Sequence, residues 1–88
     1  MCSSDLALAR RASADEPLAL WHQAERPSLS WGAGRRVLPL ARTPVPAGAT
    51  LQLLSQGPGP VPGPAGHRCQ PAASGQDGWR LWRCPAAP

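Results

Sequence analysis

The sequence predicts an α+β fold, with a short N-terminal helix followed by a small antiparallel sheet. Good helix formers fill residues 4–14, leucines recur at every second position after Pro17, and clusters of proline and glycine separate the leucine-rich segments. The first pattern is typical of a helix, and the other two are typical of short strands joined by turns. At 88 residues, the chain can form one small domain with a marginal core.

The N-terminal segment SDLALARRASA has the composition of the last turns of a helix. Leucine, alanine and arginine have high helix propensity, and Leu8 and Ala12 share a face because they stand at positions i and i+4. Pro17 stops the segment, since the residue before a proline is disfavoured in the α region. We therefore expect residues 7–15 to form the end of a helix.

Residues 16–55 contain four short segments in which apolar positions alternate as they do in half-buried strands. The pairs that share a face are Leu18 and Leu20, Leu29 and Trp31, Leu38 and Leu40, and Leu51 and Leu53, in the segments PLALWH, SLSW, RRVLPLA and ATLQLLS. Turn residues join these segments, and GAG at 32–34 reads as a tight turn. Pro39 removes a hydrogen-bond donor, so its strand is predicted at an edge or with a bulge.

Residues 56–66 contain the run GPGPVPGPAG, which predicts a stiff, extended loop of polyproline-like conformation. A short proline-rich ligand for a partner domain is the alternative. Residues 67–88 predict a hairpin and a tail, because SGQDG has turn composition and WRLWR alternates. In this hairpin, Trp79 and Leu81 face one way and Arg80 faces the other.

Cys69 and Cys84 are candidates for a disulfide, because they fall on the two arms of the predicted hairpin. In an oxidising compartment, the bridge would close a loop of about 15 residues and contribute roughly 3 kcal/mol in the chain-entropy model. Two free thiols are the alternative that the sequence leaves open. No C-x-x-C pair is present, so no metal site is predicted.

The titratable residues form no recognisable catalytic pattern. His22 and His67 are predicted on the surface, and the chain has no nucleophile elbow, paired-carboxylate site or phosphate-binding glycine loop. The formal net charge of +4 comes from scattered arginines, which disfavours nucleic-acid binding. No segment reaches the ~18 apolar residues of a membrane span. We expect no enzymatic activity and no cofactor.

The first six residues, MCSSDL, match the conceptual translation of a common sequencing-library adapter, GTGTGCTCTTCCGATCT, with GTG read as the start codon. Residues 1–6 are therefore expected to be foreign to the natural chain, and Cys2 is discounted with them. On this interpretation, the gene continues upstream of Leu6.

The order of the segments carries more information than any one of them. LALARRASA leads into PLALW, RRVLPLARTPVPAGATLQLL follows, and the tail carries G-x-R-x-x-P-x-x-S-G-x-x-G-W-R-L from Gly66 to Leu81. This order resembles the globular half of a minor pseudopilin of the type II secretion system, a class related to type IV prepilins. In that family, a helical stalk ending near A-R-x-x-A precedes a P-[VL]-x-L strand, and an LP-x-G-x-x-L-x-L strand comes later.

The likeness covers nearly the whole chain from Leu6 onward, with several departures. The matching positions are Ala9, Arg10, Pro17 to Leu20, Pro46, Gly48 to Leu53, Gly66, Arg68, Pro71, Ser74, Gly75 and Gly78. His67 and Cys69 stand where the family has apolar and aromatic strand residues, and Ala73 replaces a turn glycine. The apolar stalk and its processing site are missing from the sequence.

The resemblance implies a mechanical function as a non-enzymatic subunit. The missing stalk would anchor the parent protein in the inner membrane, and the domain would face the periplasm and contact other pseudopilins. The resemblance implies no cofactor. Candidate contact residues are Trp21, Trp31, Trp79 and Trp82, because tryptophan is enriched at interface hot spots.

Two other interpretations stay open. The chain could be a largely disordered, non-functional translation of GC-rich DNA, because Phe, Tyr, Ile, Lys and Asn, which share AT-rich codons, are all absent. A small basic binding protein is the third interpretation, and it predicts salt-sensitive association with nucleic acid.

Overall fold

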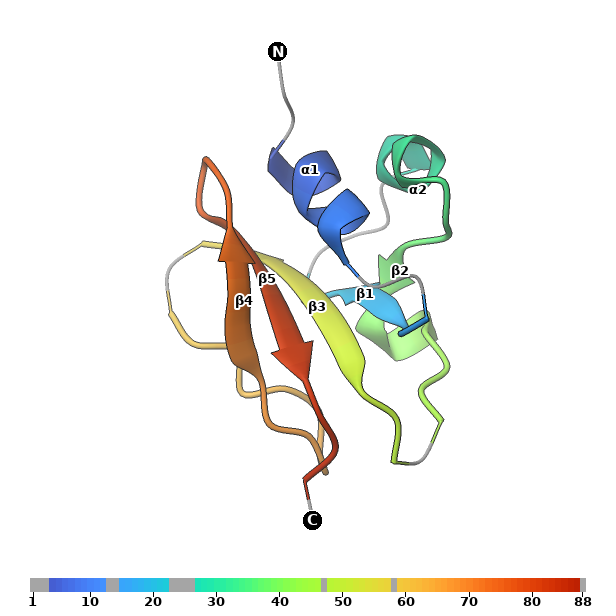
Figure 1. The fold of residues 1–88 in the computed structure, drawn as a ribbon, viewed down its shortest axis with the longest axis vertical. Helices are drawn as coiled ribbons and strands as arrows, with labels where there is room; N and C mark the ends of the chain where they lie inside the picture. Colours follow the sequence, from blue (N-terminus) through green and yellow to red (C-terminus); the bar gives the residue numbers. More distant parts are fainter. Residues whose placement is uncertain (1–3, 13–14, 23–26, 47, 58, 88) are drawn as a thin grey trace.

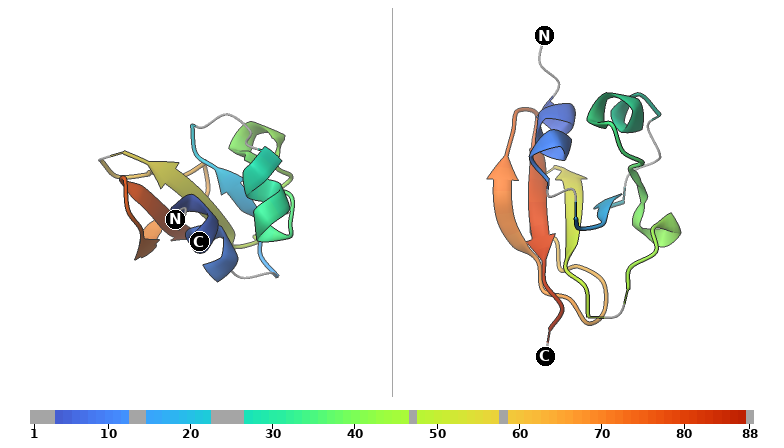
Figure 2. Two further views of the ribbon diagram at one scale, coloured as in Figure 1. Left: turned by 90° about the horizontal axis from the view of Figure 1, so that it is seen from above. Right: turned by 45° about the vertical axis from the view of Figure 1, so that its right-hand side comes forward.

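The computed structural model describes residues 4–12, 15–22, 27–46, 48–57 and 59–87. These residues form a five-stranded mixed sheet accompanied by short helices (Figures 1 and 2). In chain order, the elements are α1 (Ser4–Arg11), β1 (Leu18–Leu20), α2 (Pro27–Ala33), β2 (Leu38–Pro39), the 3-10 helix η1 (Leu40–Arg42), β3 (Leu51–Gln56), β4 (Gln70–Ser74) and β5 (Trp79–Cys84). The α+β fold class is correct, whereas a purely antiparallel sheet is not.

The sheet has a parallel half and an antiparallel half, in the strand order β2-β1-β3-β5-β4. β1 pairs in parallel with both β2 and β3, while β5 pairs antiparallel with β3 and β4. A parallel pair needs a crossover connection, often through a helix, and α2 lies in the connection from β1 to β2. The expectation of an antiparallel sheet was wrong because it assumed a strand over SLSW and hairpin returns on either side.

The segment SLSW belongs to the helix α2. Leu29 is 3% exposed and packs in the core, whereas Trp31 is 89% exposed, so the two side chains lie on opposite faces instead of sharing one. α2 begins at Pro27, a residue favoured in the first turn of a helix. It ends before Gly34, whose φ of 72° is left-handed.

Two backbone hydrogen bonds close the C-terminus of α2. The Gly34 N–H donates to the Trp31 carbonyl and the Arg35 N–H donates to the Ser30 carbonyl, both at 3.3 Å. This pair of bonds is the Schellman pattern, in which glycine takes the left-handed position. GAG is therefore the end of a helix and its cap, and the tight turn expected over 32–34 was wrong.

The segment RRVLPLA contributes only the two residues of β2. Pro39 has no N–H to donate, and the chain turns at once into η1, where the Thr43 hydroxyl donates to the Pro39 carbonyl at 3.0 Å. The predicted edge position of this strand is confirmed. The outermost strand on the other side, β4, contains Pro71 and has a bulge between Pro71 and Ala73.

Both faces of the sheet are covered. On one face, α1 and α2 pack on the strands, and the buried residues there are Leu8, Ala9, Ala12, Leu18, Leu20, Leu29, Val37, Leu54, Trp79 and Leu81. On the other face, the buried residues are Ala19, Leu51, Leu53, Val61, Trp82 and Cys84, with Leu40, Val45 and Cys69 packed against them. Figure 2 shows the helices on one side of the sheet and the long loop between β3 and β4 on the other.

The C-terminal hairpin is confirmed, with β4 and β5 as its arms. Trp79 and Leu81 lie in the same buried cluster under α1, as the alternation in WRLWR predicts. The strands expected from PLALWH and ATLQLLS are also found, as β1 and β3. Residues 13 and 14 of the expected helix, and residues 1–3 of the expected adapter segment, lie outside the described residues.

The cap of α2 can be tested with two substitutions in the same tripeptide. Gly34→Ala should lower the free energy of unfolding by roughly 1 kcal/mol, because a side chain is disfavoured at a left-handed φ. Gly32→Ala, inside the helix, should leave the free energy of unfolding unchanged or raise it slightly. Urea denaturation followed by circular dichroism measures both. Equal effects of the two substitutions would contradict the helix.

Candidate functional site

Of the four tryptophans expected at partner contacts, one is exposed, one is half-buried and two are buried. Trp31 is exposed on α2, and Trp21 is half-buried at the end of β1. Trp79 and Trp82 are each only 5% exposed, so their expected role as exposed contact residues is wrong. The reason is that β5 is covered on both faces, and the Trp82 Nε1–H donates to Ser55 Oγ at 2.8 Å inside the core.

An arginine of α1 is bonded to the residue that follows Trp31 in α2. The Arg10 side chain extends from α1, and its Nε and Nη2 atoms donate to the Gly32 carbonyl of α2 at 3.1 and 3.0 Å. Both Arg10 and Trp31 are exposed, and we call them the helix-surface pair. Tryptophan and arginine are the residue types most enriched at the centres of protein interfaces.

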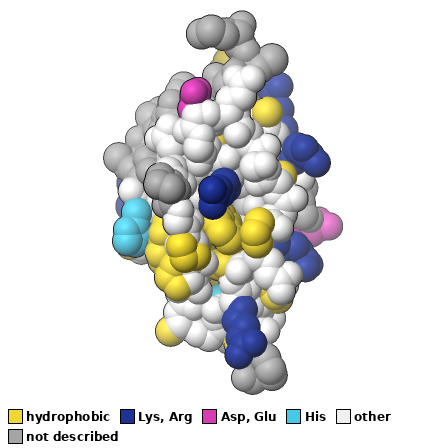
Figure 3. All heavy atoms as spheres, turned by 90° about the vertical axis from the view of Figure 1, so that its left-hand side faces the viewer, with side chains coloured by type: hydrophobic (Ala, Val, Ile, Leu, Met, Phe, Trp, Pro, Cys, Tyr) yellow, Lys and Arg dark blue, Asp and Glu magenta, His cyan; other side chains and the backbone are white. Residues whose placement is uncertain are grey.

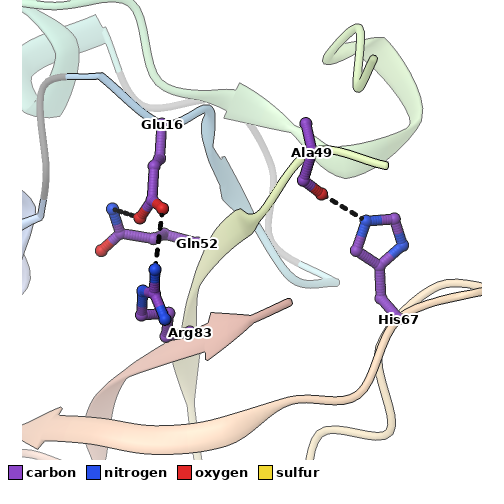
Figure 4. A network of polar contacts seen from close by, with 5 residues as sticks. All are labelled: Glu16, Ala49, Gln52, His67 and Arg83. Atoms are coloured by element: carbon purple, nitrogen blue, oxygen red, sulfur yellow. Dashed lines mark hydrogen bonds and ion pairs between the residues drawn. The ribbon is translucent and has the colours of Figure 1, made fainter. Parts of the chain in front are cut away.

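A polar network joins the end of α1 to the sheet (Figure 4). Glu16 follows α1, and its Oε1 accepts a hydrogen bond of 3.1 Å from Nε2 of Gln52 on β3. Its Oε2 forms a 3.0 Å ion pair with Nη2 of Arg83 on β5. In addition, the Glu16 carbonyl accepts a 2.6 Å hydrogen bond from Arg35, the residue after the α2 cap.

This network attaches the segment between α1 and β1 to the sheet. Gln52 is buried and Glu16 is mostly buried, so their hydrogen bond forms in a low-dielectric setting, whereas Arg83 is more than half exposed. The next backbone contact along the chain continues the attachment, since the Gln52 N–H donates to the Pro17 carbonyl at 2.8 Å. The segment just before β1 is therefore attached to β3 by side-chain and backbone bonds.

The outer surface of β4 carries an apolar hollow. Pro71, Ala72, Ala73, Ser74 and Arg80 line a volume of about 440 Å³. Figure 3 shows hydrophobic side chains gathered on this side of the molecule, with basic side chains around them. This surface is wide and open, and only Arg80 gives it a charged group.

Cys69 and Cys84 form a disulfide that ties the end of the long loop to β5. Gly63 lies against this bond, and a Cβ atom at that position would come within 2.6 Å of Cys69 Sγ. Nearby, His67 Nε2 makes a 3.0 Å hydrogen bond with the Ala49 carbonyl (Figure 4). His67 is thus half-buried instead of on the surface, while His22 is exposed as expected.

The described residues contain neither a metal-binding cluster nor a membrane-spanning helix. No group of three or more His, Cys, Asp or Glu side chains in these residues could hold a metal ion. No helix among them has the length and apolar character needed to cross a bilayer.

Comparisons with protein-family models, with curated proteins and with solved structures found no match to this chain.

The sequence analysis identified neither Glu16 nor Arg10 as a functional residue. Glu16 was missed because its partners Gln52 and Arg83 are far away in the sequence. One signal was available: Gln52 alternates with Leu51 and Leu53 in a strand, so burial of both faces requires a polar partner for it.

The Glu16 network can be tested with a graded pair of variants. Glu16→Ala should lower the free energy of unfolding by about 1–2 kcal/mol, because the buried Gln52 amide loses an acceptor. Glu16→Gln keeps an acceptor and loses only the ion pair with the exposed Arg83, which should cost at most about 1 kcal/mol. Chemical denaturation measures the difference. If both variants were equally stable, Gln52 would not depend on Glu16.

The contact between Gly63 and the disulfide can be tested against a matched glycine. Gly63→Ala and Gly59→Ala both place a side chain at a positive φ, of 81° and 102° respectively, but only the first meets an obstructing atom. Gly63→Ala should therefore destabilise the protein by about 1–3 kcal/mol more than Gly59→Ala. Thermal unfolding and titration of free thiols provide the measurement. Equal losses in the two variants would contradict the close packing.

Proposed function

We propose that this chain is a non-enzymatic structural subunit that resembles a minor pseudopilin of the type II secretion system. Its role would be mechanical, and its partners would be other pseudopilins. In the full-length parent, the domain would lie at the periplasmic face of the inner membrane, anchored by an apolar stalk upstream of α1.

The attachment of α1 carries the proposal. The helix and the residue after it bury Leu8, Ala9 and Ala12 in the core, and the Glu16 network attaches the segment before β1 to the sheet. Figure 1, in which the longest axis is vertical, shows α1 and α2 in the upper part of the molecule and the chain after β5 at the opposite end. A helix continued upstream of Ser4 would therefore leave the body at one end of its longest dimension, 41 Å. This is the arrangement that a stalk requires.

The helix-surface pair gives the proposed partner contact. Arg10 and Trp31 are both exposed, and a neighbouring pseudopilin would contact them. Because Arg10 is already bonded to Gly32, it loses little side-chain entropy when a partner binds. The disulfide also fits a periplasmic location, since disulfides persist in oxidising compartments.

The proposal can be tested by binding. The folded chain should bind the soluble domain of at least one pseudopilin from a GC-rich bacterium in isothermal titration calorimetry. Trp31→Ala and Arg10→Ala should each weaken that binding roughly tenfold, as expected of hot-spot residues. Arg68→Ala, which removes another exposed arginine, should not change it.

Two further measurements separate the proposal from the alternatives. Genomic DNA read upstream of residue 7 should continue in frame into an apolar helix. Slow amide exchange in β3 and β5 should accompany a cooperative melt, because a disordered translation product would exchange at the rate of a free peptide. An upstream frame without an apolar segment would contradict the pseudopilin assignment.

A further inference from the structure

The carboxyl ends of three parallel strands meet at one edge of the sheet. β1 lies between β2 and β3, and the chain leaves β1 through α2 toward β2, while β3 lies on the other side. Because its two neighbours are β2 and β3, the chain connections on the two sides of β1 run in opposite directions. In open sheets with parallel strands, this divergence opens a crevice beyond the strand ends, and ligands bind there.

Trp21 and His22 follow β1 directly and lie at this position. Their rings stack with centroids 4.4 Å apart and an interplanar angle of 23°. The backbone N–H of Trp21 donates a 2.8 Å hydrogen bond to the Leu54 carbonyl of β3. The two rings therefore form a stacked pair whose backbone is attached to β3 at Trp21.

His22 has a strained backbone, with a φ of 54°. A non-glycine residue in the left-handed region costs of order 1 kcal/mol or more and persists only where its surroundings impose it. Such residues concentrate at ligand sites, which makes this one an independent indication of a site.

A polar hollow adjoins the aromatic pair. It has a volume of about 160 Å³ and is lined by Trp21, His22, Ser55, Gln56, Gly57 and Gly59, among others. A second, more apolar hollow of about 340 Å³ is also lined by Trp21 and His22, together with Leu20, Pro39, Leu40 and Ala41.

The lining of the polar hollow offers hydrogen-bonding groups without formal charge. Ser55 Oγ accepts from Trp82 Nε1, so its own proton is available to a ligand. The Gln56 Nε2 donates weakly to the Asp77 carbonyl at 3.4 Å, which leaves the carboxamide oxygen as an acceptor. Among the described residues that line this hollow there is no Arg, Asp or Glu, and His22 is the one titratable side chain, so the described lining favours a neutral ligand.

We propose that this crevice binds a neutral pyranose ring, either free or at the end of a glycan chain. This site is separate from the proposed contact with other pseudopilins. The apolar C–H face of the sugar would stack on the electron-rich face of the aromatic pair. Its hydroxyl groups would bond to Ser55 and Gln56. Pockets with an aromatic wall and a few convergent polar groups are the usual form of small-molecule sites.

The test is a titration of the folded chain with neutral monosaccharides, a neutral oligosaccharide and glucose 6-phosphate. Indole and amide chemical shifts in the NMR spectrum report binding at Trp21, and we expect dissociation constants in the millimolar range. Tighter binding of the oligosaccharide than of every monosaccharide would identify a glycan end as the ligand. Equal affinities would identify the free sugar.

Two variants and a matched control locate the site. Trp21→Ala and Gln56→Ala should each weaken binding roughly tenfold. Gln70→Ala removes a second exposed glutamine, on β4, and should leave the affinity unchanged. Gln56→Ala also serves as the test if Trp21→Ala does not fold, because Gln56 is exposed. The proposal is overturned by an absence of binding, by preference for the phosphorylated sugar, or by equal losses in the Gln56 and Gln70 variants.

Discussion

The two halves of the sheet are joined by a single strand, β3, on which the rest of the structure depends. β3 pairs in parallel with β1 and antiparallel with β5, so its backbone bonds in both directions. All side chains from Leu51 to Ser55 are buried, because helices cover one face and the disulfide-bonded loop covers the other. The same strand supplies Gln52 to the Glu16 network and Ser55 to the crevice.

The two proposed sites occupy different parts of this framework. The helix-surface pair lies on the outer side of α1 and α2, where Arg10 is fixed by a carbonyl group of the neighbouring helix. The crevice lies beyond the carboxyl ends of the parallel strands, where the aromatic pair is fixed by Leu54. The first site rests on a side-chain bond between two helices, and the second on a backbone bond between β1 and β3. A partner and a small ligand could therefore bind without competing for the same residues.

Alternation of leucines predicted β1 and β3, and the turn composition of SGQDG with the alternation in WRLWR predicted the C-terminal hairpin. In these segments the apolar side chains that alternate along the strand are the ones that become buried. Alternation failed over SLSW, where Leu29 and Trp31 lie on opposite sides of a helix. Two local signals for that helix were present, Pro27 at its start and Gly34 just after its end. The Glu16 network could not be predicted from the sequence. Its residues come together only through the order of the strands in the sheet, and no local sequence pattern encodes that order.

The prolines of the two outermost strands limit how copies of this protein can associate through the edges of the sheet. A strand can be extended by another chain only where its free side offers a regular series of amide donors, and Pro39 interrupts β2 while Pro71 and the adjoining bulge disturb β4. Cross-β stacking of one copy onto the next is thereby discouraged. Any ordered polymer built from this domain must instead rely on side-chain recognition, which can be reversed when a fibre has to be dismantled.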